Sequence, residues 1–227
     1  MITAMRVPLV AAAALGLVLG GHPAAGQARG GNCVALGTPN PSLTYTYVRT
    51  ERGATVEYST QWEEVTDTGS RQRTTRAGRG GGTSNNVSRH RVENDVSIIL
   101  ETVQSGTDGS GPFTSTTVFE PGVVGDPFGR ACAGRSWPIA SVTAINRSGR
   151  GTFSARSDAG ELKMLGIHER VTVAAGMFDT VHYTRTTSGA RGTIVDEYWK
   201  SIEHGVTVKH QSTLIGMFTT EILQSIR

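Results

Sequence analysis

The sequence predicts an all-β protein: one antiparallel, strongly curved sheet that forms a half-open barrel, with at most one short helix. Apolar and polar side chains alternate over most of the chain, which is the period of strands with one buried face. The 227 residues include 29 glycines and 8 prolines, and this composition favours turns over long helices. Because 37% of the residues are hydrophobic and 18% are charged, one core can form, and neither a coiled coil nor a disordered chain fits.

The first 26 residues have the pattern of a secretory signal peptide. A basic start at Arg6 is followed by an apolar run from Val7 to Leu19 and by small residues that end at Gly26. The apolar run has 13 residues, whereas a helix that spans a membrane needs roughly 20. We therefore expect a single soluble domain, residues 27–227, exported to the periplasm or secreted by a bacterium without a stable membrane anchor.

Charge and composition argue against a nucleic-acid partner. The formal net charge is only +3, and an exported domain with so small an excess is a poor candidate for nucleic-acid binding. Residues 69–86 are rich in Gly, Arg, Ser and Thr and look similar to RNA-binding repeats. A solvated connection is the more common role of such a segment, so we predict a flexible loop there.

Cys33 and Cys132 are the two cysteines of the chain. In an oxidising compartment one disulfide between them is the simplest interpretation. It would close a loop of about 100 residues, which is worth up to roughly 4–5 kcal/mol in the chain-entropy model. Two free thiols, or a catalytic cysteine, are the alternative, but the sequence has no Cys-x-x-Cys spacing that would favour a redox or metal function.

The first half of the chain contains short segments of strand pattern. Residues 43–48 and 56–63 predict a hairpin that turns near Arg52 and Gly53. After the predicted loop, strands are expected at 96–103 and 113–119, an irregular segment tied down by Cys132 at 120–138, weaker strands at 137–145 and 150–155, and one or two helical turns at 158–165.

From Ile167 onward the alternation is clearer. Turns are expected at 174–176, 188–191, 203–205 and 215–216, and the segments between them predict four consecutive antiparallel strands. Strands of nine to eleven residues span about 30 Å, and such long strands require a twisted and curved sheet.

Three features of this region carry a family resemblance. The run Glu169–Thr180, the aromatic pair Tyr198–Trp199 and the step Gly205–Val206 resemble the TapB-like group of bacterial exported proteins. Ala174 stands where that group usually has proline, and Met177 where it has threonine. The likeness implies an all-β, partly closed barrel, exported to the periplasm or cell envelope, of mostly unknown activity. It brings no catalytic residues with it.

The hairpin at 188–191 suggests one reactive pair. If Gly189 and Ala190 are the central residues of the turn, His182 lies opposite Glu197 on a partly apolar face. An imidazole beside a carboxylate can act as a general acid–base pair. A cross-strand ion pair worth at most about 1 kcal/mol is the simpler interpretation, and we favour it.

Aromatic side chains on the long strands suggest a ligand site. These are Tyr45, Tyr47, Tyr58, Trp62, Phe178, Tyr198 and Trp199. On the concave face of a half-open barrel they either fill the interior or leave a groove for a lipid, another apolar ligand or a partner segment. The candidate ligand-binding residues are His182, Glu197, Trp199, Phe178 and Tyr198.

Motifs of the common enzyme classes are not found in the sequence. It contains no Gly-x-Ser-x-Gly elbow, no phosphate-binding loop and no histidine spacing typical of a zinc site, so we predict no catalytic residues, no metal and no cofactor. The leading hypothesis is a non-catalytic exported envelope protein that binds an apolar ligand or a partner segment on its concave face. The alternatives are a hydrolase that uses His182 and Glu197, and a structural or assembly protein that pairs with another envelope protein.

Overall fold

The computed structural model describes residues 32–77, 82–108, 111–149, 151–157, 159–189, 192–214 and 217–227. The predicted signal peptide, residues 1–26, lies outside the described residues. The described residues form strands and no helix, so the prediction of an all-β fold is confirmed. The strands are β1 Cys33–Ala35, β2 Thr44–Glu51, β3 Ala54–Glu63, β4 Gly69–Ala77, β5 Thr83–Glu93, β6 Val96–Asp108, β7 Gly111–Pro127, β8 Arg130–Cys132, β9 Ser136–Ile139, β10 Thr143–Ser148, β11 Gly151–Arg156, β12 Gly160–Val173, β13 Gly176–Gly189, β14 Gly192–Ser201, β15 Thr207–Leu214 and β16 Met217–Ile226.

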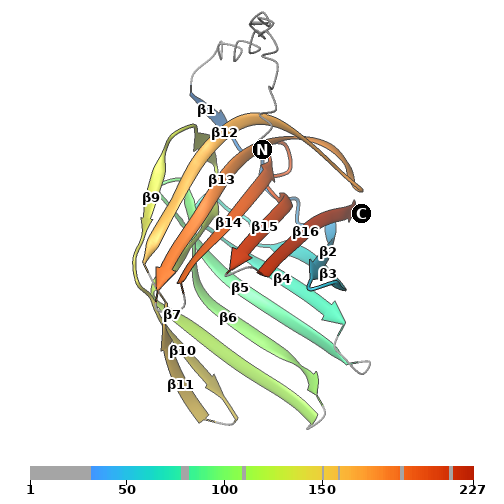
Figure 1. The fold of residues 1–227 in the computed structure, drawn as a ribbon. Helices are drawn as coiled ribbons and strands as arrows, with labels where there is room; N and C mark the ends of the chain where they lie inside the picture. Colours follow the sequence, from blue (N-terminus) through green and yellow to red (C-terminus); the bar gives the residue numbers. More distant parts are fainter. Residues whose placement is uncertain are drawn as a thin grey trace, which may run out of the picture. The chain divides into compact units, whose positions relative to one another are not determined.

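Within the described residues, the strands make a two-stranded sheet, β1–β8, and a fourteen-stranded antiparallel sheet. The order of the large sheet is β11-β10-β7-β6-β5-β4-β3-β2-β16-β15-β14-β13-β12-β9. We call β2–β7 with β10 and β11 the N-terminal half, and β12–β16 with β9 the C-terminal half. Hairpins connect most neighbours within each half, and the pairing of β16 with β2 joins the halves (Figure 1).

Tight turns in the N-terminal half follow from local sequence. Arg52 and Gly53 connect β2 to β3 with φ values of 50° and 78°, and Asn94 and Asp95 connect β5 to β6 with φ values of 53° and 63°. Two-residue hairpin turns with both φ values positive match the twist of the flanking strands, and Gly, Asn and Asp adopt them most easily. The predicted hairpin at Arg52–Gly53 is confirmed.

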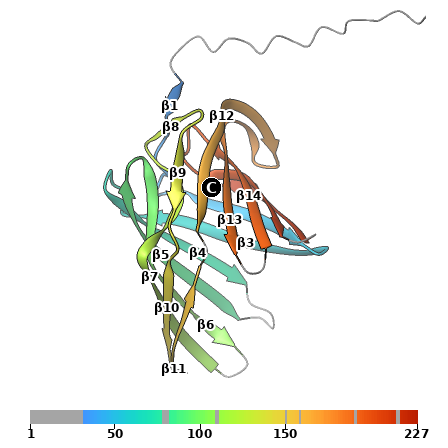
Figure 2. The same ribbon diagram turned by 60° about the vertical axis from the view of Figure 1, so that its left-hand side comes forward.

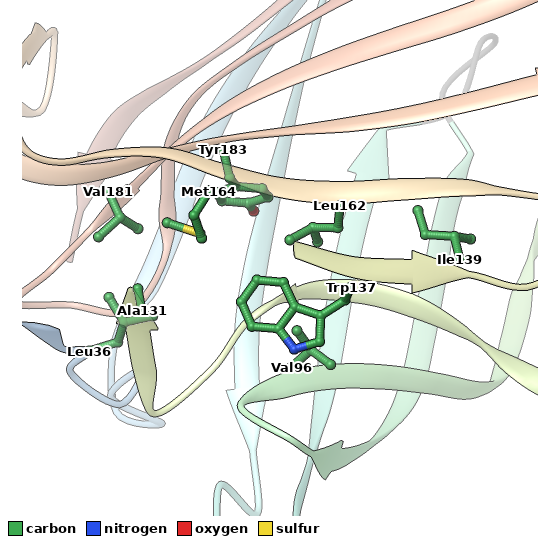
Figure 3. Close-up of a cluster of buried hydrophobic side chains, with 9 residues drawn as sticks. All are labelled: Leu36, Val96, Ala131, Trp137, Ile139, Leu162, Met164, Val181 and Tyr183. Atoms are coloured by element: carbon green, nitrogen blue, oxygen red, sulfur yellow. The ribbon is translucent and has the colours of Figure 1, made fainter. Parts of the chain in front are cut away.

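Two buried clusters fill the space beside the large sheet. In the first, Val96 of β6, Trp137 of β9 and Leu162 of β12 point toward one another (Figure 3). The second joins Tyr47 of β2 to Phe178 of β13 and neighbouring side chains of β3, β15 and β16. Both clusters draw on both halves, so apolar burial holds the halves together. Figure 2 shows the segment with β8 and β9 passing beside β12 before the chain returns to β10.

The predicted flexible loop at 69–86 is wrong. β4 and β5 pair continuously from Gly69 with Arg91 to Ala77 with Thr83, and residues 78–81 lie outside the described part of the chain. Polar side chains stabilise these strands: the Thr75 hydroxyl donates to Asn85 Oδ1 at 2.9 Å, and Arg73 Nε donates to Glu63 Oε1 at 2.9 Å. Because hydrogen-bonded polar partners replace an apolar face here, composition alone is misleading.

The predicted helical turns at 158–165 are also wrong, because this segment begins β12. Leu162 and Met164 are buried and alternate with exposed neighbours, which is a period of two. β13 and β9 pair with the segment on its two sides and satisfy its backbone hydrogen bonds.

The segment 120–138 is more regular than expected, since β7 continues to Pro127. The consecutive antiparallel strands predicted after Ile167 are confirmed.

The predicted disulfide between Cys33 and Cys132 is confirmed. The two residues are register partners in the β1–β8 sheet and are 99 residues apart in sequence. The bond therefore ties the start of the described chain to the segment that connects the two halves.

Removal of the disulfide is expected to destabilise the domain. In the double variant Cys33→Ser/Cys132→Ser the unfolded chain regains the entropy of a loop of about 100 residues, so the free energy of unfolding should fall by up to about 4–5 kcal/mol. Urea unfolding followed by tryptophan fluorescence measures the difference. An unchanged midpoint, or two alkylatable thiols in the oxidised wild-type protein, would contradict the expectation.

Candidate functional site

A cavity of about 270 Å³ lies between the two halves of the sheet. Its walls come from β2–β7 on one side and from β13–β16 on the other, together with Val206 just before β15. Aromatic and polar side chains share the lining: Tyr47, Tyr58, Thr60, Trp62, Gln72, Thr74, His90, Ile99, Gly125, Asp126, Tyr183, Arg185, Tyr198, Val206, Thr207 and Glu221.

Strand alternation brings the aromatic side chains of the N-terminal half to the cavity. Tyr58, Thr60 and Trp62 are alternate residues of β3, so their side chains share one face of the sheet. Tyr47 is the register partner of Tyr58, and their rings stack with centroids 5.3 Å apart. The N-terminal half therefore contributes a stacked pair of tyrosine rings and Trp62 to the lining.

A second aromatic stack crosses the C-terminal half. Tyr183, Tyr198 and His210 are register partners on β13, β14 and β15, with ring centroids 4.9 Å and 4.3 Å apart. His210 Nε2 lies 3.2 Å from Asp196 Oδ1. Burial raises the pKa of Tyr183 well above its usual range, and it raises that of Tyr198 in the same way. Both phenols are therefore neutral hydroxyls at physiological pH.

An ion pair behind the cavity connects the halves. Lys200 of β14, with only 1% of its side chain exposed, binds the Asp126 carboxylate of β7 and donates to Pro127 O at 2.7 Å. Ser97 Oγ donates to Asp126 Oδ1 at 2.9 Å. Burial raises the pKa of Asp126, but the Lys200 ammonium and the bond from Ser97 outweigh it and keep the pKa below its ordinary value. Asp126 is therefore an anion beside the cavity.

His90 is the most unusual polar group of the lining. Its side chain is 7% exposed, packs 5.7 Å from Trp62 between ring centroids, and has no hydrogen-bond partner at either ring nitrogen. Burial lowers the pKa of the imidazole, against the attraction of Asp126, so the ring is neutral at pH 7. A neutral imidazole has one N–H donor and one acceptor nitrogen. Buried polar groups normally have partners, so two unpaired nitrogens on one residue of a cavity lining are exceptional.

Arg185 adds a second unpaired donor. Its buried Nε has no hydrogen-bond partner, and its side chain lines the cavity opposite β3 and β4. Asp126 and Glu221 place two carboxylates in the same lining, and Lys200 neutralises the first of them from outside it. The arrangement can hold a small ligand that stacks on tyrosine rings and hydrogen bonds at its edge.

The predicted pairing of His182 with Glu197 is wrong. His182 lies opposite Trp199, with the rings stacked 4.4 Å apart, and Glu197 lies opposite Thr184. Pairing continues to Gly189 with Gly192, so the register differs by two residues from the expected one. The carboxylate near His182 belongs to Glu169, whose Oε1 lies 3.3 Å from Nδ1.

The five candidate ligand-binding residues do not meet at the cavity. Tyr198 lines the cavity, whereas His182, Glu197 and Trp199 lie outside its lining and Phe178 packs in the second buried cluster. Three of the aromatic residues noted in the sequence, Tyr47, Tyr58 and Trp62, do line it. His90, Asp126, Arg185 and Glu221 were not predicted, because each needs a partner strand that is distant in sequence.

No known protein family, curated protein or solved structure matches the chain. The resemblance to the TapB-like group therefore stays a prediction. In the part of the chain that the structure describes, no three His, Cys, Asp or Glu side chains are grouped as metal ligands. A search of the same residues finds no helix with the length and hydrophobicity needed to cross a membrane.

Breaking the buried ion pair is expected to destabilise the protein. Lys200→Met leaves the Asp126 carboxylate without its cation, and a lone buried charge costs about 3–5 kcal/mol. Asp126→Asn leaves Lys200 unpaired and should have a similar effect. The double variant removes both charges and should lose less than the sum of the single variants. Chemical unfolding of the four proteins tests this, and strictly additive losses would show that the pair is not coupled.

His90 should make stability depend on pH. Its pKa is lowered in the folded state from the ordinary 6.5, so the unfolded chain binds a proton at higher pH than the folded one. The contribution of His90 to the free energy of unfolding is therefore complete above pH 6.5. It decreases as the pH drops from there to the folded-state pKa. His90→Gln should remove this part of the decline. Equal slopes for wild type and variant between pH 7 and pH 5 would refute the role of His90.

Proposed function

We propose that the protein is a non-catalytic, exported binding protein of the bacterial cell envelope. In this proposal the large sheet is a half-open barrel, and the cavity on its concave face holds a small ligand. The observation that carries the proposal is a cavity whose lining includes a 93% buried histidine with both ring nitrogens unpaired. Such groups are costly to bury unless something binds them.

The lining favours an amphipathic ligand over a purely apolar one. Four tyrosines and Trp62 provide ring faces, while His90, Arg185 and the two carboxylates provide hydrogen-bonding groups. A cavity of about 270 Å³ is at the lower end of ligand sites, which usually measure roughly 300–1,000 Å³. A compound of about the size of one ring fits this space, and a long acyl chain does not.

Two features support export. The Cys33–Cys132 disulfide is typical of an oxidising compartment, and the first 26 residues have the pattern of a signal peptide. Both agree with the location that the TapB-like resemblance implies.

An assembly function is the second candidate, and the edge strand β11 favours it. All six residues of β11 are exposed, and 66% of the Phe153 surface is accessible. An unpaired edge can add a strand from a partner. Stoichiometric capture of one envelope protein, lost in Phe153→Glu, would favour this function.

A hydrolase that uses His182 has weaker support. Glu169 accepts a hydrogen bond from Trp199 Nε1 at 3.2 Å as well as lying beside His182, and the His182 ring is covered by Trp199. These contacts suit a packed cross-strand cluster better than a group that must reach a substrate. Hydrolytic activity abolished by His182→Gln would establish the enzyme instead.

Filling the cavity should abolish ligand binding. Thr74 of β4 lines the cavity, and Thr75 projects from the opposite face of the same strand, so Thr74→Phe and Thr75→Phe form a matched pair. Native mass spectrometry of protein from its own host should find a copurifying small molecule on wild type and Thr75→Phe but not on Thr74→Phe. Absence of any ligand from all three proteins, with the fold intact, would overturn the proposal.

A further inference from the structure

A groove of about 860 Å³ continues from the cavity across the N-terminal half. Tyr58, Thr74 and Glu221 line both the groove and the cavity, so the two spaces adjoin at these side chains. The other residues of the groove are Arg49, Thr55, Val56, Glu57, Arg76, Ala77, Ser84, Asn86 and Gln104. The inference below rests on the proposed function, since it concerns what extends out of the same cavity.

The groove is polar without net charge. Arg76 and Glu221 carry opposite charges, Arg49 is paired with Glu51 at 3.0 Å, and the remaining polar side chains of this face are hydroxyls and amides. The aliphatic contribution is small, because only Val56 and Ala77 are apolar. An acyl chain would leave the amides and hydroxyls unpaired, and a polyanion or polycation would meet a like charge.

Over β4–β6 the floor of the groove offers side chains and little free backbone. β4 pairs with β3 and β5, and β5 pairs with β4 and β6, so most of their ladder groups are already bonded. β3 pairs with β4 only from Tyr58 to Glu63, so a peptide added as a strand would find only the short free edge of Ala54–Glu57. Along β4–β6 a ligand must be recognised by side-chain groups such as the Asn86 and Gln104 amides and the Ser84 hydroxyl.

The polar groups of the floor both donate and accept hydrogen bonds. Asn86 is the register partner of both Thr74 and Gln104, and Gln104 Nε2 contacts Ser84 Oγ at 3.4 Å. A row of amides and hydroxyls therefore crosses β4, β5 and β6. Each of these groups can give and receive a hydrogen bond, which matches a ligand whose own groups are hydroxyls.

Tyr58, one of the two stacked tyrosines, lies where the groove meets the cavity. Tyr58 is half-buried and belongs to both spaces, and the Tyr47 ring stacks on it at 5.3 Å between centroids. The C–H face of a sugar ring is apolar and its edge carries hydroxyls, so it packs on an aromatic face while its edge hydrogen bonds. His90 and Arg185 lie in the cavity that such a ring would enter.

We infer that the groove and cavity together bind an uncharged oligosaccharide, with its terminal sugar in the cavity and the following units along β3–β6. The groove is larger than the cavity, 860 Å³ against 270 Å³, so it has room for further units beyond the terminal sugar. The row of Thr74, Asn86 and Gln104 hydrogen bonds the chain beyond the terminal sugar.

Calorimetry with neutral tetrasaccharides of glucose, galactose, mannose and N-acetylglucosamine, each beside its monosaccharide, tests the inference. At least one tetrasaccharide should bind ten or more times as tightly as its monosaccharide. Asn86→Ala should weaken the tetrasaccharide about 5- to 10-fold, the usual effect of losing a neutral hydrogen bond. It should leave the monosaccharide unaffected. Tyr58→Ala should weaken both.

Asn85→Ala is the matched control, because Asn85 neighbours Asn86 on β5 and its side chain lies on the opposite face, where it accepts a bond from Thr75. It should bind like wild type. Equal losses in Asn85→Ala and Asn86→Ala, or tighter binding of an uncharged Gly-Ser octapeptide or of a fatty acid, would overturn the inference. If no saccharide binds while the host-derived ligand is still lost in Thr74→Phe, the inference fails and the proposed function stands. If no saccharide binds and no host-derived ligand is found on the wild-type protein, the inference and the proposed function are both overturned.

Discussion

The contact between Lys200 and Asp126 determines how the large sheet is arranged. β7 and β14 are eight strands apart in the sheet order, which corresponds to about 38 Å across a flat sheet. Their side chains nevertheless form an ion pair, and Ser97 and Pro127 O complete its hydrogen bonds. The two halves must therefore face each other. The space enclosed beside this pair is the cavity, so its position depends on the same contact.

The surroundings of the ion pair show how closely the backbone is fitted. A Cβ on Gly125 would come within 2.5 Å of Ser97 Oγ, so a larger residue would displace the hydroxyl that holds Asp126. Phe128 lies 5.8 Å from the Lys200 ammonium and separates it from water on that side. We expect the buried charges, satisfied in this way, to favour one arrangement of the halves. The apolar clusters then fill the space on both sides.

Local sequence was enough to predict the fold class and most strands of the C-terminal half. Alternation at Val171, Val173, Val206 and Val208 and the glycine turns specify strands wherever one face is apolar. The prediction failed at β4 and β5, where cross-strand hydrogen bonds between polar side chains replace apolar burial. It also failed at β12, since the partner strands that fix Leu162 and Met164 are not visible in a single segment.

The candidate site was less predictable than the fold. The aromatic residues of β2 and β3 were visible from their alternation, and Tyr47, Tyr58 and Trp62 do reach the cavity. The predicted pairing of His182 with Glu197 was wrong because a hairpin register depends on which two residues form its turn. His90 and Asp126 gave no signal, because their importance comes from burial and from groups on strands that are far away in sequence.

The pairing of β16 with β2 affects how the chain folds. Thr219 pairs with Glu51 across 168 positions, so one side of β2 stays without a neighbour until nearly the whole domain has been delivered. Such distant pairings raise contact order and slow folding. A chain that emerges progressively as it is made exposes the backbone amides of β2 to incorrect association. The domain should consequently depend on holding chaperones more than a sheet assembled solely from adjacent hairpins.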